Sequence, residues 1–158
     1  MNSETRPGTL RRSNGATIAY RTIPGKSPGI VFMTGYRSRM EGAKALALEA
    51  YARSTGRAFT RFDYQGHGES EGDFESANLS TWIGDALAVV DEVTSGPLVL
   101  AGSSMGAWIA TLVAERRPER VAGFIGIAVA PDFTSELIEP SLSAEARAAR
   151  SEEHTSEL

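Results

Sequence analysis

The sequence has no cysteine and only two histidines, His67 and His154, among its 158 residues. Without cysteine the chain forms no disulfide, thiolate nucleophile or sulfur-ligated metal site, and this composition fits a reducing compartment. The two histidines lie too far apart in sequence to make a recognisable metal-binding motif. We therefore expect no metal site.

Long apolar runs and clustered basic residues are also missing. No stretch reaches the ~20 apolar residues that a membrane helix needs, and residues 1–15 lack the apolar segment of a secretory signal peptide. The net charge of −4 provides no positive field for holding a phosphate backbone. We expect a cytoplasmic protein without a nucleic-acid partner or a membrane span. The composition leaves its oligomeric state open.

The N-terminal part predicts a loose end followed by a hairpin. Residues 1–8 are polar and include a proline and a glycine, which predicts a flexible terminus. Asn14-Gly15 lies between two short strand-like runs, and this dipeptide readily takes the positive φ values of a tight turn. The sequence therefore predicts a leading antiparallel hairpin.

Strand-like and helix-like segments alternate after the hairpin. Buried strands are expected in the runs IVFMTG, RAFTRFD, LVLAGS and VAGFIGIAVA. Helices are expected over 40–53, after a cap at Ser80, and in the run MGAWIATLVAERR. This order predicts an α/β fold in which helices flank a mostly parallel sheet, with the core over 9–130.

One serine lies at a junction between a predicted strand and a predicted helix. Gly102, Ser104 and Gly106 fit the pattern G-x-S-x-G, which is weak evidence as a string but gains weight from this position. A serine at such a sharp turn is exposed above the sheet, and small neighbours let the strand and the helix pass closely. The pattern is typical of the nucleophile elbow of acyl-transfer enzymes.

Such chemistry needs donors for an oxyanion and a base for the serine proton. The amide of Met105, after the serine, and the amide of Tyr36, in the loop after a strand, are the candidate donors. His67 is a candidate base, and a structural role in its loop is the alternative hypothesis. Asp132 is a candidate acid, and N-capping of a helix is its alternative.

Four stretches, GYRSRMEGAKALALEA, RFDYQGHGESEG, GPLVLAGSSMGAW and GFIGIAVAPDF, together resemble the α/β-hydrolase superfamily. Within it, the sequence is similar to the branch of palmitoyl-protein thioesterases, mycophenolic acid acyl-glucuronide esterases and their bacterial relatives. The resemblance implies that Ser104 is the nucleophile, that the amides of Tyr36 and Met105 form the oxyanion hole, and that no cofactor is needed. Ala107 departs from the family, which often has glycine there.

The C-terminal part departs further. The family's later strands supply an aspartate and then a histidine, whereas residues 131–149 read as the start of a lid segment. Residues 150–158, RSEEHTSEL, can be encoded by AGA TCG GAA GAG CAC ACG TCT GAA CTC, a string that resembles a sequencing adapter. We therefore expect a C-terminally truncated chain in which His154 has no functional role.

These observations predict a serine hydrolase acting on carboxylic esters or thioesters of small molecules or acylated proteins, through an acyl-enzyme on Ser104. The chain as given is expected to be inactive, or nearly so, and to associate through an uncovered sheet edge. Two alternatives remain open: a non-catalytic binding protein on a hydrolase scaffold, and an acyltransferase. The acyl-chain preference cannot be read from these residues.

Overall fold

A six-stranded sheet forms the centre of the molecule. The computed structural model describes residues 4–129, and its strands lie in the order β1-β2-β4-β3-β5-β6. β1 and β2 are antiparallel, β2 is antiparallel to β4, and the remaining neighbours are parallel. The strands are β1 (Arg6–Arg11), β2 (Thr17–Ile23), β3 (Lys26–Met33), β4 (Arg57–Phe62), β5 (Leu98–Ser103) and β6 (Val121–Ile127). The predicted α/β fold with a leading antiparallel hairpin is confirmed.

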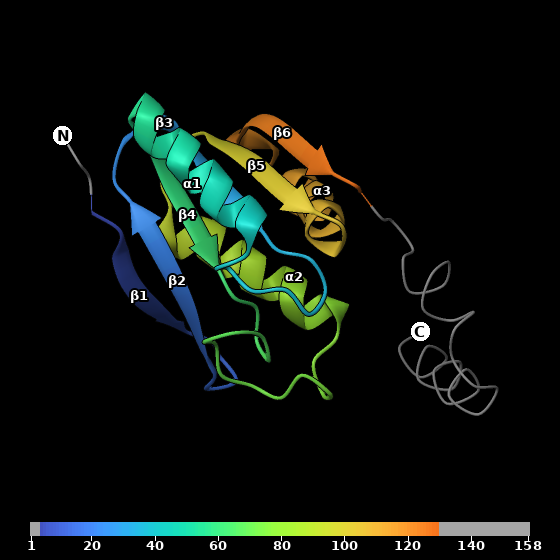
Figure 1. Ribbon diagram of the computed structural model, residues 1–158. Coiled ribbons are helices and arrows are strands. Elements are labelled where there is room, and N and C mark those ends of the chain that lie inside the picture. The colour runs from blue at the N-terminus through green and yellow to red at the C-terminus, as the bar shows by residue number, and fades with distance from the viewer. Residues whose placement is uncertain (1–3, 130–158) are drawn as a thin grey trace.

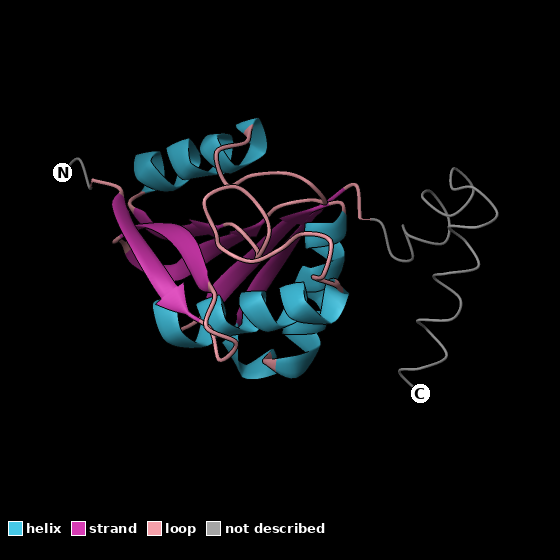
Figure 2. Ribbon diagram, turned by 90° about the horizontal axis from the view of Figure 1, so that it is seen from below, coloured by secondary structure: helices cyan, strands magenta, loops and turns pink. Residues whose placement is uncertain are grey.

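Helices cover both faces of this sheet (Figures 1 and 2). One helix lies on one face and two lie on the other, as expected for parallel strands joined by helical connections. The helices are α1 (Ala43–Thr55), α2 (Leu79–Ala88), which continues as the π-helix η1 (Val89–Val93), α3 (Met105–Arg116) and the short 3-10 helix η2 (Pro118–Arg120). No helix within residues 4–129 is long and apolar enough to cross a membrane.

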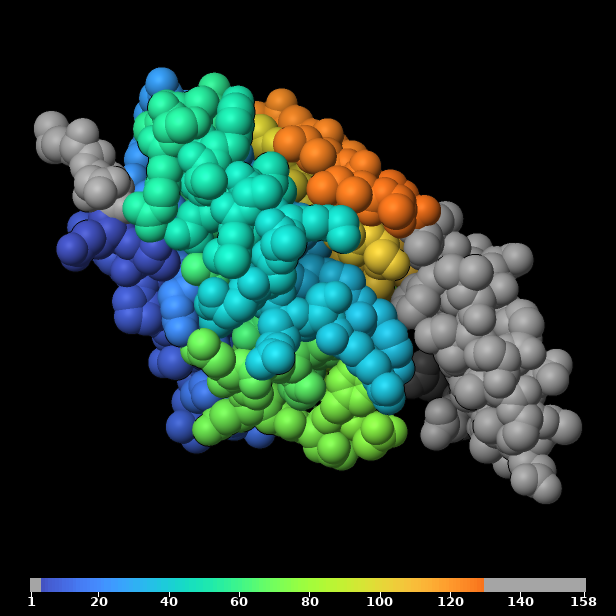
Figure 3. Space-filling view, viewed as in Figure 1, coloured from blue at the N-terminus to red at the C-terminus, as the bar shows by residue number. Residues whose placement is uncertain are grey.

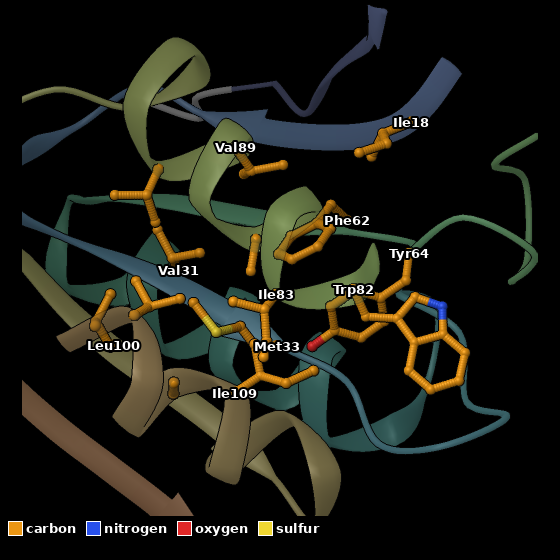
Figure 4. Packing of buried hydrophobic residues seen from close by; sticks show 14 of the residues in the cluster. Ile18, Val31, Met33, Phe62, Tyr64, Trp82, Ile83, Val89, Leu100 and Ile109 are labelled. Carbon is orange, nitrogen blue, oxygen red and sulfur yellow. The ribbon is translucent and has the colours of Figure 1, made fainter. Parts of the chain in front are cut away.

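Two apolar clusters form the core, one on each face of the sheet. The larger cluster lies between the sheet and α2 and α3, and includes Met33, Tyr64, Trp82 and Ile109 (Figure 4). The smaller cluster lies beneath α1. Its buried members are Ile23, Ile30, Phe32, Ala45, Ala52, Phe59 and Ala101.

The hairpin differs from its prediction in two ways. β1 begins at Arg6, so the prediction of a flexible terminus is wrong for residues 6–8; a proline is tolerated there because β1 is an edge strand. The turn spans residues 12–16, because Gly15 has a positive φ of 91° whereas Asn14 does not. A two-residue turn of the predicted kind requires positive φ at both positions.

The start of α2 also differs from its prediction. The predicted cap at Ser80 is wrong: Asn78 is the N-cap of α2, and its side chain accepts a hydrogen bond from the amide of Thr81 at 3.0 Å. Thr81 in turn accepts a hydrogen bond from the Asn78 amide at 3.3 Å, which completes a capping box. α1 ends at Thr55, and Gly56, whose φ is 67°, is its C-cap.

β6 is an edge strand within the described part of the chain, and Figure 3 shows it at the molecular surface. Phe124 is 41% exposed and Ile125 is 39% exposed. Since neighbouring strand residues point to opposite faces, both faces of β6 present apolar surface. The association through a sheet edge expected from the sequence stays a prediction.

Candidate active site

Ser104 forms the turn between β5 and α3. Its φ is 55° and its ψ is −122°, a conformation that costs a residue with a β carbon about 1–3 kcal/mol. Its amide donates to the carbonyl of Ile127 at 2.9 Å, which attaches the turn to the end of β6. Ser104 is half-buried, and its hydroxyl makes no capping hydrogen bond to the described first turn of α3. The hydroxyl therefore takes no part in holding the helix.

The two glycines beside this serine lie in backbone contact with other segments. A β carbon on Gly102 would stand 2.4 Å from the carbonyl oxygen of Gly106. A β carbon on Gly106 would stand 2.1 Å from the carbonyl oxygen of Met33 and 2.4 Å from that of Thr34. No side chain fits at either position, since these neighbours are backbone atoms that cannot turn aside.

The loop that follows β3 lies directly against Ser104. A β carbon on Gly35 would be 3.5 Å from the Ser104 β carbon and 3.2 Å from the Ser103 carbonyl oxygen. Tyr36 follows Gly35 in this loop, whereas Met105 begins α3. The first amides of a helix have no partner within that helix and carry a partial positive charge. The two predicted donor amides thus belong to two different segments, one that follows Ser104 in sequence and one whose Gly35 lies against it.

An aromatic cluster supports the same loop. The Tyr36 ring lies 5.3 Å from the Phe74 ring and 6.0 Å from the Trp82 ring, and the Arg37 guanidinium lies 4.9 Å from the centre of Phe74. Trp82 is only 6% exposed and donates from its indole nitrogen to the Gln65 carbonyl at 3.1 Å. Trp82 is therefore a core residue, and it holds the Gln65 backbone in place.

His67, the candidate base, has a structural role. Its Nε2 accepts a hydrogen bond from the amide of Arg37 at 3.2 Å, and its Nδ1 lies 3.2 Å from the carbonyl oxygen of Gln65. Burial lowers the pKa of His67, which is 4% exposed. Both ring nitrogens are already bonded to backbone groups, so His67 is not positioned to take the proton of Ser104. The prediction of His67 as base is corrected in favour of its structural alternative.

Two buried aspartates hold the loops around His67. Asp63 accepts from the amides of Met40 at 2.7 Å and Glu69 at 2.9 Å, and burial raises its pKa. Asp85, on α2, is fully buried and accepts from the amide of Gln65 at 2.9 Å. Asp85 is a functional residue that no sequence motif singled out. The signal was present: Asp85 lies three residues after Trp82, on the apolar face of its helix.

Comparison with known proteins identifies the family. Residues 28–151 match the family described as serine aminopeptidase, S33. The chain belongs to this family of α/β hydrolases. It is 46% identical over 123 residues to the human protein named palmitoyl-protein thioesterase ABHD10, mitochondrial. That match covers 78% of this chain and 40% of the relative, so the chain spans about two fifths of the length of this relative.

Solved structures agree with this assignment. Mouse alpha/beta hydrolase domain-containing protein 10 superposes with a TM-score of 0.83 at 40% identity, over 91% of this chain and 57% of the mouse chain. A protein from Agrobacterium vitis S4 superposes with a TM-score of 0.81 at 40% identity, over 94% of this chain and 60% of the other. The resemblance to the thioesterase branch is therefore confirmed.

The expected cytoplasmic location is contradicted by the same relatives. The human and mouse proteins, each 46% identical to this chain over the matched residues, are both named as mitochondrial. The inference was wrong because an apolar leader marks secretion only. Mitochondrial import uses amphipathic, arginine-rich segments, which a search for apolar runs does not detect.

Some predicted elements lie outside the described residues. Asp132, the candidate acid, is one of them, and so are the segments 131–149 and 150–158 with His154. Within residues 4–129 no group of three or more histidine, aspartate or glutamate side chains is placed to hold a metal ion. A cavity of about 280 Å³ lies near the starts of β3, β4 and β5, whereas Ser104 follows the end of β5.

Proposed function

We propose that this hydrolase cleaves carboxylic esters or thioesters through an acyl-enzyme on Ser104. The observation that carries the proposal is the positive φ of Ser104 between Gly102 and Gly106, whose close contacts impose the sharp turn. The relatives named as palmitoyl-protein thioesterases favour acyl thioesters of small molecules or proteins as substrates. The proposal requires no cofactor.

The geometry supports the usual order of steps in acyl transfer. The Ser104 oxygen attacks the acyl carbon while its proton passes to a base, and negative charge develops on the former carbonyl oxygen. The amides of Met105 and Tyr36 would stabilise that charge, which is the largest contribution in many such enzymes. The thiol or alcohol leaves with a proton, and water then releases the carboxylic acid and restores the serine.

The base is proposed to come from outside residues 4–129. His67 is the only histidine in that range, and both of its ring nitrogens are bonded to backbone groups. Asp132 stays the candidate for the acid that orients such a base. The inactivity of the 158-residue chain, expected from the sequence, stays a prediction.

Chemical rescue by imidazole tests the nucleophile. The chain would be treated with a fluorophosphonate probe, with and without added imidazole as an external base. We expect little labelling of the unmodified chain and a clear increase with imidazole. Ser104→Ala should abolish the labelling, whereas Ser103→Ala, the matched control one residue earlier, should retain it. Labelling that survives in Ser104→Ala, or a rescued chain that stays unlabelled, would contradict the proposed role.

The same conditions separate the alternatives. Release of acid from a palmitoyl thioester and from a p-nitrophenyl ester would be compared under rescue, with and without an added amine. Preferential capture of the acyl group by the amine would favour the acyltransferase. Binding of a palmitoyl thioester without any acylation of Ser104 would favour the non-catalytic binding protein.

A further inference from the structure

The neutral imidazole of His67 joins the loop after β4 to the loop after β3, and the second of these lies against Ser104. His67 belongs to the loop after β4, yet its Nε2 accepts from the amide of Arg37, thirty positions earlier in the loop after β3. The ring is buried among three aromatic rings whose centres lie 5.1–5.7 Å away: Tyr64, Phe74 and Trp82. This packing fixes the plane of the imidazole and the direction of Nε2.

The hydrogen bonds define which nitrogen carries the proton. Nδ1 lies 3.2 Å from the Gln65 carbonyl oxygen, which only accepts, so Nδ1 is the donor. Nε2 faces an amide, which only donates, so Nε2 must be unprotonated. Both hydrogen bonds are therefore formed by the neutral tautomer that carries its proton on Nδ1, and the charged imidazolium cannot form both.

The amide bonded by His67 belongs to a strained turn. The Ser38 amide donates to the Gly35 carbonyl at 3.1 Å, and Arg37, the third residue of this turn, has a φ of 55°. Glycine or asparagine is usual at such a position, since a long side chain there is unfavourable. The bond to His67 offsets that strain. It also fixes the peptide group after Tyr36, the residue proposed to donate to the oxyanion.

We propose that His67 is a positioning residue that sets the oxyanion loop: its neutral Nε2 holds the turn from Gly35 to Ser38, and protonation of that nitrogen releases it. On protonation, the N–H of Nε2 would face the N–H of Arg37, and two donors repel each other. The consequence for catalysis rests on the proposed function. The coupling between His67 and the turn does not.

The charged groups around the ring act in both directions. Burial lowers the pKa of His67, and the positive charge of Arg37 lowers it further. The hydrogen bond to the Gln65 carbonyl raises the pKa, and so do the carboxylates of Asp63, directly after β4, and Asp85, on α2. The net shift is downward from 6.5. The turn should therefore be held at neutral pH and be released only in more acidic solution.

Nitrogen NMR of the full 158-residue chain tests this inference without requiring any reaction. The His67 ring should show a protonated Nδ1 and an unprotonated Nε2 at neutral pH. As the pH falls, the amide signals of Arg37 and Tyr36 should move with the same midpoint as the ring, below that of a histidine in an unstructured peptide. An Nε2–H tautomer, or an Arg37 amide that does not follow the ring, would overturn the proposal.

Two variants separate positioning from packing. His67→Gln retains a side-chain acceptor that does not titrate, so the pH response of the Arg37 amide should disappear while the turn persists. His67→Phe retains the ring but removes the acceptor, so hydrogen-exchange protection of the Arg37 amide should fall about fivefold, as expected for one hydrogen bond. Unchanged protection in a folded His67→Phe chain would overturn the role. An unreactive Ser104 would bear only on the proposed function.

Discussion

Gly106 and Met33 are in backbone contact: a β carbon on Gly106 would stand 2.1 Å from the Met33 carbonyl oxygen. This contact joins the first turn of α3 to the end of β3, and so brings Ser104 beside the loop that carries Tyr36. Gly106→Ala should force these segments apart and lower the free energy of unfolding by about 1–3 kcal/mol. Denaturant unfolding followed by circular dichroism measures the change.

Gly123 provides the control for this substitution. A β carbon on Gly123 would meet the Val99 side chain at 3.5 Å, an ordinary contact, so Gly123→Ala should change the stability by no more than about 0.5 kcal/mol. Equal losses in the two variants would show that the contact with Met33 has no special role.

Much of this architecture could be predicted because its signals are local. The elbow at Ser104 is a short pattern between an apolar strand and a helix, and the glycines that it needs are part of the same pattern. The signal for the capping box at Asn78 is also local, with Thr81 three positions later, although the predicted cap was Ser80. In such cases the information is present in a few neighbouring residues.

The interactions that were missed join distant positions. The bond between Arg37 and His67 links two loops through the tertiary fold, and no pattern within either loop indicates it. The buried face of α1 could not be predicted from its own residues either. Leu46 is 43% exposed, whereas Glu49 is buried because Arg61 on β4 pairs with it. A charged residue faces the sheet only when its partner is there, and this partner is twelve positions away.

The buried pair of Glu49 and Arg61 should make stability depend on pH. The Glu49 Oε2 lies 2.6 Å from the Arg61 Nε. Burial alone would raise the pKa of Glu49, but hydrogen bonds from Arg61, Arg53 and Thr5 outweigh it, and the net shift is downward from 4.5. A carboxylate whose pKa is lower in the folded state than in the unfolded state stabilises the fold at pH values above the unfolded-state pKa. That contribution is lost as the pH falls through the folded-state pKa.

Glu49→Gln tests this dependence. The substitution should lower the free energy of unfolding by about 1.5–3 kcal/mol at neutral pH, the range for hydrogen bonds to charged groups. The difference from the unmodified chain should shrink as the pH falls below about 4.5. Glu41→Gln is the matched control, because Glu41 bonds the same arginine from a side chain that is 49% exposed. It should cost at most about 1 kcal/mol. A difference for Glu49→Gln that is independent of pH would contradict the assignment.

Asp85→Asn should loosen the loop that begins at Gln65. Asp85 accepts from the Gln65 amide, from the Gln65 side chain at 2.7 Å and from the Arg12 guanidinium at 3.1 Å. An asparagine offers one acceptor oxygen and places a donor against these donors, which costs about 1–3 kcal/mol for a buried group. Hydrogen exchange at the Gln65 amide should accelerate. Asp91→Asn, at an exposed pair with Arg117, should change the stability by less than about 1 kcal/mol. Equal effects of the two substitutions would contradict this account of Asp85.

The absence of cysteine makes a direct test of the Ser104 environment possible. Ser104→Cys and Ser103→Cys each introduce a single thiol, and the pH dependence of its alkylation by iodoacetamide gives its pKa. A thiol at the start of α3 faces the positive end of the helix dipole, so Ser104→Cys should have a pKa below the usual value of about 8.5. Ser103→Cys lies at the end of β5, before the helix, and should keep its pKa near or above that value. Equal midpoints would mean that no positive field converges on position 104, and would contradict an oxyanion site beside this residue.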